Sequence, residues 1–225
     1  MTFWDRIANI YDIAESINGD VYHEMCEITR RLTPAGAKVL DCAAGTGELS
    51  LAASENAESV MCTDLSENML SAAKRKAKLM GADNISFEAR NIFDLKDPDN
   101  TYDVVIAGNV LHLLVNPQGA VKELYRVLKP GGKLLLPTFT SKNRAKLMLK
   151  AYKLLGFDPA AEYSPAEYKK MLEECGLGRV YTKLVRGTIP CCYAVIIKPE
   201  TEETSAENTD NYERNNHHEK DLQAH

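Results

Sequence analysis

Apolar and polar positions along this chain switch repeatedly between two spacings, and the switching predicts strands and helices in turn. Apolar runs of strand length occupy residues 38–42, 59–64, 84–88 and 102–107. Between these runs, apolar residues recur three or four positions apart, as they do on the buried face of a helix. The pattern predicts helices that begin near Glu48, after the N-cap residue Ser66, and at Pro117.

Two of these helices have recognisable ends. The helix after Ser66 has a glycine at position 81, and it carries Leu70, Ala73, Ala77 and Met80 at helical spacing. The helix from Pro117 places five apolar residues on one face: Ala120, Val121, Leu124, Val127 and Leu128. The Pro-Gly-Gly sequence at residues 130–132 then predicts a break before a strand at residues 133–136.

The late part of the chain has a different pattern. Ser164 and Glu167 form a capping-box signature for a helix that runs to about Cys175 and ends at Gly176. Two β-rich runs follow at residues 179–185 and 191–198, joined by only five residues. Because a parallel return would need a crossover of a dozen residues or more, these runs are predicted to form an antiparallel hairpin.

Together the elements predict an α/β fold with a doubly wound, mostly parallel sheet and helices on both faces. We expect one domain over residues 1–199. Residues 200–225 contain eight acidic residues against Arg214 and Lys220, a net charge of −6, and few large apolar residues. We expect this acidic tail to be disordered, because it lacks the apolar surface that would offset its ordering entropy.

Composition excludes several classes of function. The total charge is −5, so the chain outside the tail carries about +1, and it has no basic surface for nucleic acid. No apolar run is long enough to span a membrane. The six cysteines are not needed to hold together a chain of this size, and most lie in apolar runs. A cytoplasmic location is therefore expected.

Small residues follow the first strand, where an open α/β sheet binds its ligand. Residues 41–50 read Asp-Cys-Ala-Ala-Gly-Thr-Gly-Glu-Leu-Ser, so little side-chain bulk keeps a ligand from the backbone. Asp64 ends the next strand, and a carboxylate there can accept hydrogen bonds from both ribose hydroxyls of an adenosine. The loop and Asp64 together indicate an adenosine cofactor.

The identity of the cofactor is narrowed by what the loop lacks. Ser50 stands where the dinucleotide fingerprint has its third glycine, and no Walker lysine follows the loop. A donor with an adenosine and no pyrophosphate fits better. Two alternatives remain open: a non-catalytic adenosine-binding module and, less favoured, an NAD-dependent oxidoreductase. Turnover of the donor would distinguish the first, and NADH binding the second.

Four segments resemble the class I S-adenosylmethionine-dependent methyltransferases in order and spacing: residues 41–47, Asp64, residues 100–105 and residues 126–132. The chain is most similar to the subgroup of ubiquinone/menaquinone-biosynthesis methyltransferases and related small-molecule enzymes. The resemblance covers roughly residues 3–137 and includes an N-terminal lid at about residues 1–32. It implies a seven-stranded Rossmann-like sheet, S-adenosylmethionine as donor with S-adenosylhomocysteine as product, and a small-molecule acceptor.

The resemblance also implies roles for individual residues. Asp41 would hold the loop, Asp64 would bind the ribose, Leu65 would pack on the adenine, and Asn91 and Ile92 would reach its edge. Gly108 and Asn109 would face the methionine end and the acceptor. The complete set of cofactor-binding residues expected on this basis is Tyr11, Asp41, Ala43, Gly45, Gly47, Asp64, Leu65, Asn91, Ile92, Gly108 and Asn109.

His112 is the candidate general base, because it lies a helical turn beyond Asn109 in a predicted helix at residues 110–114. The alternative is a histidine that only packs there. Cys191 and Cys192 are adjacent on a strand, so their side chains are expected on opposite faces, which does not suit a shared metal. No metal site is expected, and the sequence leaves open the acceptor, the atom methylated and the oligomeric state.

Overall fold

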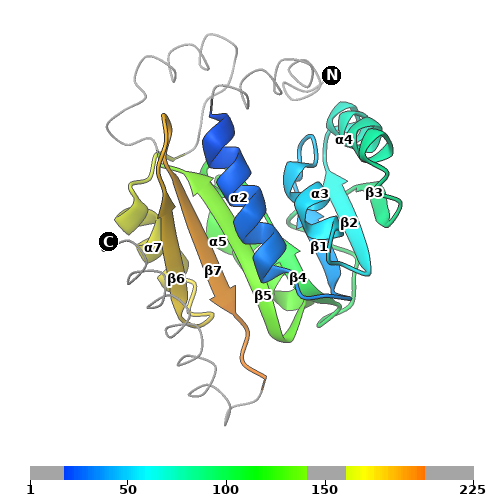
Figure 1. Cartoon of the computed structure of the whole chain (residues 1–225). Coiled ribbons are helices and arrows are strands. Elements are labelled where there is room, and N and C mark those ends of the chain that lie inside the picture. Colours follow the sequence, from blue (N-terminus) through cyan, green and yellow to red (C-terminus); the bar gives the residue numbers. More distant parts are fainter. Residues whose placement is uncertain (1–17, 141–160, 201–225) are drawn as a thin grey trace, which may run out of the picture.

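The computed structural model describes residues 18–140 and 161–200, which form a seven-stranded sheet between two layers of helices (Figure 1). The strands are β1 (Lys38–Cys42), β2 (Ser59–Asp64), β3 (Ile85–Ala89), β4 (Tyr102–Ile106), β5 (Leu128–Phe139), β6 (Val180–Val185) and β7 (Cys191–Ile197). The helices are α2 (Gly19–Leu32), α3 (Glu48–Ser54), α4 (Glu67–Met80), η1 (Leu111–Leu113), α5 (Pro117–Val127) and α7 (Pro165–Glu173).

The strand order is β3-β2-β1-β4-β5-β7-β6. The first five strands in this order pair in parallel, and β7 pairs antiparallel with both β5 and β6. The predicted doubly wound, mostly parallel seven-stranded sheet with an antiparallel C-terminal hairpin is therefore confirmed. The direction of strand succession reverses between β1 and β4, and this is the place where sheets of this kind bind ligands.

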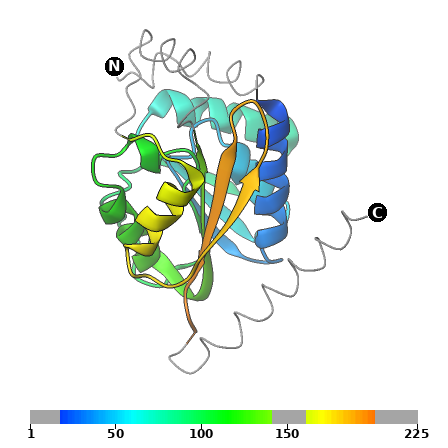
Figure 2. The ribbon, with the colours of Figure 1, turned by 90° about the vertical axis from the view of Figure 1, so that its left-hand side faces the viewer.

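Helices α2, α3 and α4 cover one face of the sheet, and α5 and α7 cover the other (Figure 2). Strand side chains alternate between the two cores, as the period of two requires. Cys191 belongs to the core under α2, while Cys192 belongs to the core under α5 and α7. The expectation that these adjacent thiols point to opposite faces is confirmed.

Helix α2 is held against the sheet by its buried side chains and by the residue before its first turn. Val21, Met25 and Thr29, four residues apart, are fully buried against the sheet. Asn18, the residue before the helix, exchanges two hydrogen bonds with the backbone of Ile189 in the β6–β7 turn, at 2.9 and 3.3 Å. The part of the predicted lid from residue 18 to 32 is thus packed on the sheet, and residues 1–17 lie outside the described residues.

Two elements differ from the sequence prediction. Strand β5 begins at Leu128, not at residue 133, and it continues through Pro-Gly-Gly to Phe139. Its early part is supported on both sides, because Leu128 pairs with Tyr102 of β4 and the residue after β7, Lys198, bonds to the two glycines. Gly131 N–H donates to Lys198 O at 2.7 Å, and Lys198 N–H donates to Gly132 O at 3.0 Å. The predicted helix at residues 110–114 was also wrong in type, since only the short 3₁₀ helix η1 forms there.

Among the helices within residues 18–140 and 161–200, none combines the length and hydropathy that crossing a bilayer requires. All six cysteines fall in these ranges and are free thiols. The acidic tail from residue 201 onward lies outside the described residues, as does residue 11.

Candidate functional site

The loop that follows β1 lies at the carboxyl edge of the sheet, at the reversal of strand order. Ala43, Gly45 and Gly47 all adopt positive φ, at 55°, 56° and 84°. A Cβ added at Gly47 would lie 2.9 Å from the Cβ of Ala73 on α4. Glycine at position 47 therefore permits both the left-handed backbone and the close approach of the loop to α4.

The Asp64 carboxylate, at the end of β2, ties this loop to the next helix. Its Oδ2 accepts the N–H of Gly45 at 2.9 Å, and its Oδ1 accepts the N–H of Ser66 at 2.8 Å. A carboxylate has about four acceptor positions, so a carboxylate at this place can accept from hydroxyl groups as well as from backbone N–H groups. The adjacent Leu65 side chain is 67% exposed and offers an apolar surface beside the carboxylate.

Asp41 is a buried carboxyl group beneath the same loop. Its Oδ2 accepts the Ser50 hydroxyl at 2.6 Å, whereas its buried Oδ1 has no hydrogen-bond partner among the described residues. Burial raises the pKa of Asp41 to about 7, against the bond from Ser50, and the charge of Asp64 adds to the rise. Asp41 therefore has one buried carboxylate oxygen without a donor among the described residues.

A cavity of about 210 Å³ joins these groups. Eight of the residues expected from the sequence line it: Asp41, Ala43, Gly45, Asp64, Leu65, Ile92, Gly108 and Asn109. Because β3, β2, β1 and β4 lie side by side in that order, the cavity extends from Ile92 after β3 to Asn109 after β4.

Three expected residues do not line the cavity. Gly47 is buried behind the loop, against α4. Asn91 is exposed, and its Oδ1 accepts the N–H of Phe93 at 3.0 Å, which closes a local turn. His112 is the third, and Tyr11 cannot be placed because it lies outside the described residues.

The environment of His112 lowers its basicity. Burial lowers the pKa of His112 to about 4, so the imidazole is neutral at pH 7. Its Nδ1 lies 3.5 Å from the Thr138 hydroxyl on β5. A base with a pKa near 4 accepts a proton poorly at neutral pH, which favours the packing interpretation of this residue.

The β4 end of the cavity has a fixed backbone. Asn109 adopts φ 53°, its N–H donates to Pro137 O at 2.8 Å, and its Oδ1 accepts the N–H of Phe139 at 3.0 Å. A Cβ added at Gly108 would lie 2.6 Å from Cδ1 of Leu49, which itself lines the cavity. Glycine at 108 therefore preserves space in the cavity.

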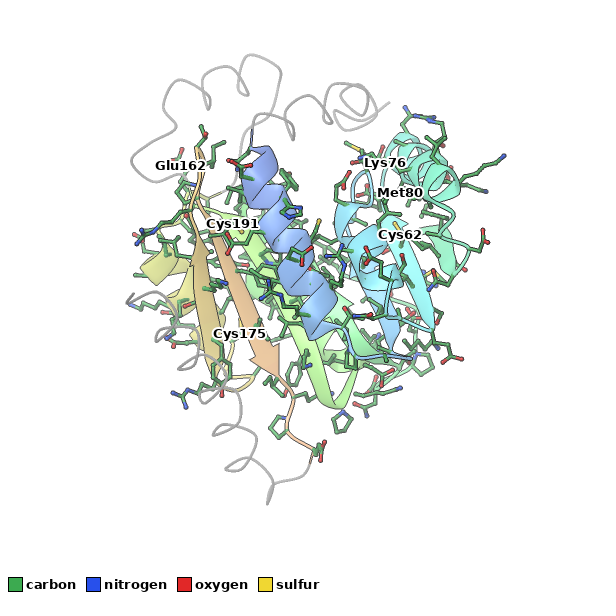
Figure 3. All side chains as sticks on the ribbon, viewed as in Figure 1. Cys62, Lys76, Met80, Glu162, Cys175 and Cys191 are labelled. Atoms are coloured by element: carbon green, nitrogen blue, oxygen red, sulfur yellow. The ribbon has the colours of Figure 1, made fainter. Side chains whose placement is uncertain are left out.

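Sequence reasoning missed several lining residues: Tyr22, Met25, Ala44, Glu48, Leu49, Met69, Arg90, Val110, Leu113 and Leu114. Most are apolar and have no local signal, because helix α2 and η1 reach the cavity only in the folded chain. Glu48 is neutralised by Lys76, which is labelled in Figure 3 and reaches from α4 to the start of α3. Arg90 follows β3 directly. The alternation of side chains along that strand would have predicted that Arg90 and Asn91 point in opposite directions.

Metal chemistry has no obvious site in the part of the chain that the structure describes. No group of three or more His, Cys, Asp or Glu side chains there is arranged to hold an ion.

Several known proteins are similar to this chain in sequence, in fold or in both. A family model described as a methyltransferase domain matches residues 34–176. The chain is 33% identical over 141 residues to a demethylmenaquinone methyltransferase of Clavibacter sepedonicus, an alignment that covers 61% of this chain and 57% of that protein. It is 32% identical over 162 residues to a ubiquinone/menaquinone biosynthesis C-methyltransferase of Hydrogenovibrio crunogenus, with 69% and 63% covered.

A solved methyltransferase structure is also similar to this chain. The chain is similar to a SAM-dependent methyltransferase from Aquifex aeolicus with a TM-score of 0.59 and 25% identity, over 76% of this chain and 88% of that one. The aligned part of this chain spans only about 57–63% of the length of the two curated relatives named above.

Proposed function

The chain belongs to the class I S-adenosylmethionine-dependent methyltransferases, and from this premise we propose that it transfers a methyl group from S-adenosylmethionine to a small-molecule acceptor. The donor would occupy the cavity between Ile92 and Asn109. The donor supplies an electrophilic methyl group on a sulfonium, and the chain's own residues bind and orient it.

One observation carries the proposal: two carboxylates with acceptor capacity and a glycine-containing loop meet in one cavity at the reversal of strand order. Asp64 suits the two ribose hydroxyls. The Oδ1 of Asp41, which has no partner among the described residues, suits a hydrogen-bond donor such as an ammonium group. Positive φ at Ala43, Gly45 and Gly47 turns the loop so that S-adenosylmethionine has room to contact the loop backbone. These residues fit the cofactor.

The acceptor is proposed to be neutral and apolar. The β4 and α2 side of the cavity is lined by Met25, Leu49, Val110, Leu113 and Leu114. The carboxylate nearest the start of α3, Glu48, is paired with Lys76 and does not offer a free charge. Quinone-like acceptors, which the names of the two relatives specify, belong to this chemical class.

Methyl transfer at this site is proposed to depend on positioning. An in-line displacement needs the acceptor atom and methyl group held in contact and aligned, and this alone lowers the barrier substantially. His112 is a weak base in its buried environment. An acceptor whose reacting atom is nucleophilic while the molecule is still neutral fits this site better than an alcohol that must first lose a proton.

A cytoplasmic location is proposed on the basis of the cysteines. Six free thiols, five of them buried, are typical of a chain that folds in a reducing compartment.

The test is donor binding followed by turnover. Wild-type protein is expected to bind S-adenosylhomocysteine in a calorimeter and not NADH. Asp64→Ala is expected to weaken that binding by about 1–3 kcal/mol, the cost of leaving hydroxyl groups unpaired. Asp94→Ala is a matched control, because Asp94 is an exposed carboxylate outside the cavity. Equal affinity in wild type and Asp64→Ala would refute the donor site.

Methyl transfer itself is measured with labelled donor over a panel of acceptors that pairs each neutral apolar compound with a charged analogue. Transfer to neutral members is the expected result. Donor binding without transfer to any member would favour the non-catalytic adenosine-binding module.

A further inference from the structure

Arg90 is a charged residue at the end of the cavity where the adenosine of the donor is proposed to bind. It follows β3 and lines the cavity together with Asp64, Leu65 and Ile92. Its backbone N–H donates to the backbone oxygen of Asp64 at 3.2 Å. Arg90 is therefore a direct neighbour of the proposed ribose-binding carboxylate, and it lies on the side of the cavity away from Asn109.

Two carboxylates hold the guanidinium of Arg90 in place. One terminal nitrogen donates to Oε2 of Glu88 at 2.7 Å, and the other donates to Oδ2 of Asp97 at 2.5 Å. Asp97 in turn accepts the hydroxyl of Tyr102 at 2.7 Å through its other oxygen. The side chains of Arg90 and Asp97 are each only 13% exposed. The guanidinium is thus a fixed group of the site.

These contacts leave one of the three guanidinium nitrogens, Nε, without a hydrogen bond among the described residues. Nε of Arg90 is buried and has no hydrogen-bond partner among the described residues. Buried N–H groups in proteins are nearly always paired, and an exception calls for an explanation such as a missing ligand. Because arginine has five N–H donors and no acceptor, only a hydrogen-bond acceptor can complete its environment.

We propose that Arg90 is a specificity-determining residue for the donor, and that its Nε–H donates to a ring nitrogen of the adenine. Adenine offers acceptors at N1, N3 and N7, whereas its exocyclic amino group is a donor and cannot pair with arginine. This inference rests on the proposed function, since it requires the adenosine to lie between Leu65 and Ile92.

The inference also explains why Asn91 lies outside the cavity. Successive residues at a strand end point in opposite directions, so only one of residues 90 and 91 can face the base. The structure has Arg90 among the lining residues, while Asn91 closes a turn with Phe93. The base edge would then be read by a cationic donor in place of an amide.

The experiment compares S-adenosylhomocysteine with its 1-deaza, 3-deaza and 7-deaza analogues, each of which replaces one ring nitrogen by a C–H group. Binding of all four compounds is measured calorimetrically to wild type and to Arg90→Lys, which keeps the positive charge and removes Nε–H. In wild type, one deaza analogue is expected to bind roughly 10- to 100-fold more weakly, the range for a bond from a charged donor. In Arg90→Lys that penalty should shrink to within about twofold.

The comparison separates a role of Arg90 in binding the adenine from a role in the stability of the fold. Arg126 is a matched control, because it pairs with Glu123 and Asp99 but does not line the cavity. Arg126→Lys is expected to keep the wild-type penalty for the same analogue even if its melting temperature falls. Contacts from backbone N–H groups, such as that of Ile92, would persist in Arg90→Lys and so cancel in the comparison.

The outcomes are distinguishable. If all three analogues show the same penalties in wild type and in Arg90→Lys, the inference is overturned, while the proposed function stands as long as S-adenosylhomocysteine itself binds. If wild type does not bind S-adenosylhomocysteine, the proposed function fails first.

Discussion

Replacing Asp41 with Asn is expected to stabilise the folded chain at pH 8 and to leave its stability nearly unchanged at pH 4. The Asp41 carboxyl is buried beneath the loop, and burial, reinforced by the charge of Asp64, raises its pKa to about 7. In the unfolded chain the same carboxyl returns to a value near 3.8. Folding therefore favours the protonated form.

The sign and size of this stability change follow from the linkage between proton binding and folding. Because the folded pKa lies above the unfolded one, the stability that the protonated carboxyl allows is fully present below pH 3.8 and is lost as pH rises to about 7. Each pKa unit corresponds to about 1.4 kcal/mol, so the complete loss is roughly 4 kcal/mol. Asparagine resembles the protonated carboxyl, still accepts the Ser50 hydroxyl and does not ionise.

The measurement is the free energy of unfolding in urea at several pH values between 4 and 8, for wild type and Asp41→Asn. The difference between the two proteins should be small at pH 4 and should grow to a few kcal/mol at pH 8. Asp103→Asn is a control of opposite sign. Burial would raise the pKa of Asp103, but the hydrogen bonds from the Lys129 side chain and the Lys38 N–H lower it overall. Removing the Asp103 carboxylate should therefore destabilise the chain at neutral pH. A difference for Asp41→Asn that does not change with pH would refute the reasoning.

Two further predictions test the β4 end of the cavity. Because burial lowers the pKa of His112 to about 4, its contribution to stability is present above pH 6.5 and is lost as pH falls toward 4. His112→Gln should therefore flatten the loss of stability in this acid range, measured by urea unfolding, and should change turnover by less than about tenfold; a loss of 10²–10⁴-fold with donor affinity intact would instead identify a general base. Gly108→Ala places a Cβ against Leu49 and should weaken S-adenosylhomocysteine binding several-fold, whereas Gly19→Ala, which meets no atom within 4 Å, should not; equal affinities would show that space at Gly108 is not needed.

Sequence pattern was sufficient wherever the signal was local. The strand at residues 38–42, the Ser66 cap and the capping box of Ser164 and Glu167 all have the predicted positions, since each depends on neighbours within a few residues. The antiparallel hairpin was also predictable, because the five-residue connection allows little else. These elements fixed the fold class.

Features that depend on distant partners were not predictable. Strand β5 extends back to Leu128 because Leu128 pairs with Tyr102 of β4 and because Lys198 bonds to Gly131 and Gly132, which look like a turn in isolation. The pKa of His112 depends on burial that no neighbouring residue signals. Arg90 and Asn91 differ by one position, and the choice between them depends on which side of β3 faces the cavity. The glycine-containing loop at residues 43–47 was visible in the sequence, and the residues that α2 and η1 add to the cavity were not.

The order in which the strands enter the sheet has a consequence for synthesis of the chain. Strand β7 lies between β5 and β6, so its residues are interior to the sheet although they are made late. When β5 has left the ribosome, β1, β2, β3 and β4 are already available to pair, but the far edge of β5 has no partner until residues 191–197 appear.

At roughly 5–20 residues per second this interval lasts several seconds. Throughout it, the backbone of Leu134, Leu135 and Leu136 is an open apolar strand edge, which is the kind of surface that pairs with other chains. The nascent protein is therefore most prone to aggregation between the completion of β5 and the arrival of β7. Chaperone binding or slow translation matters most over this stretch, well after the loop at residues 43–47 and the carboxylates of Asp41 and Asp64 have been made.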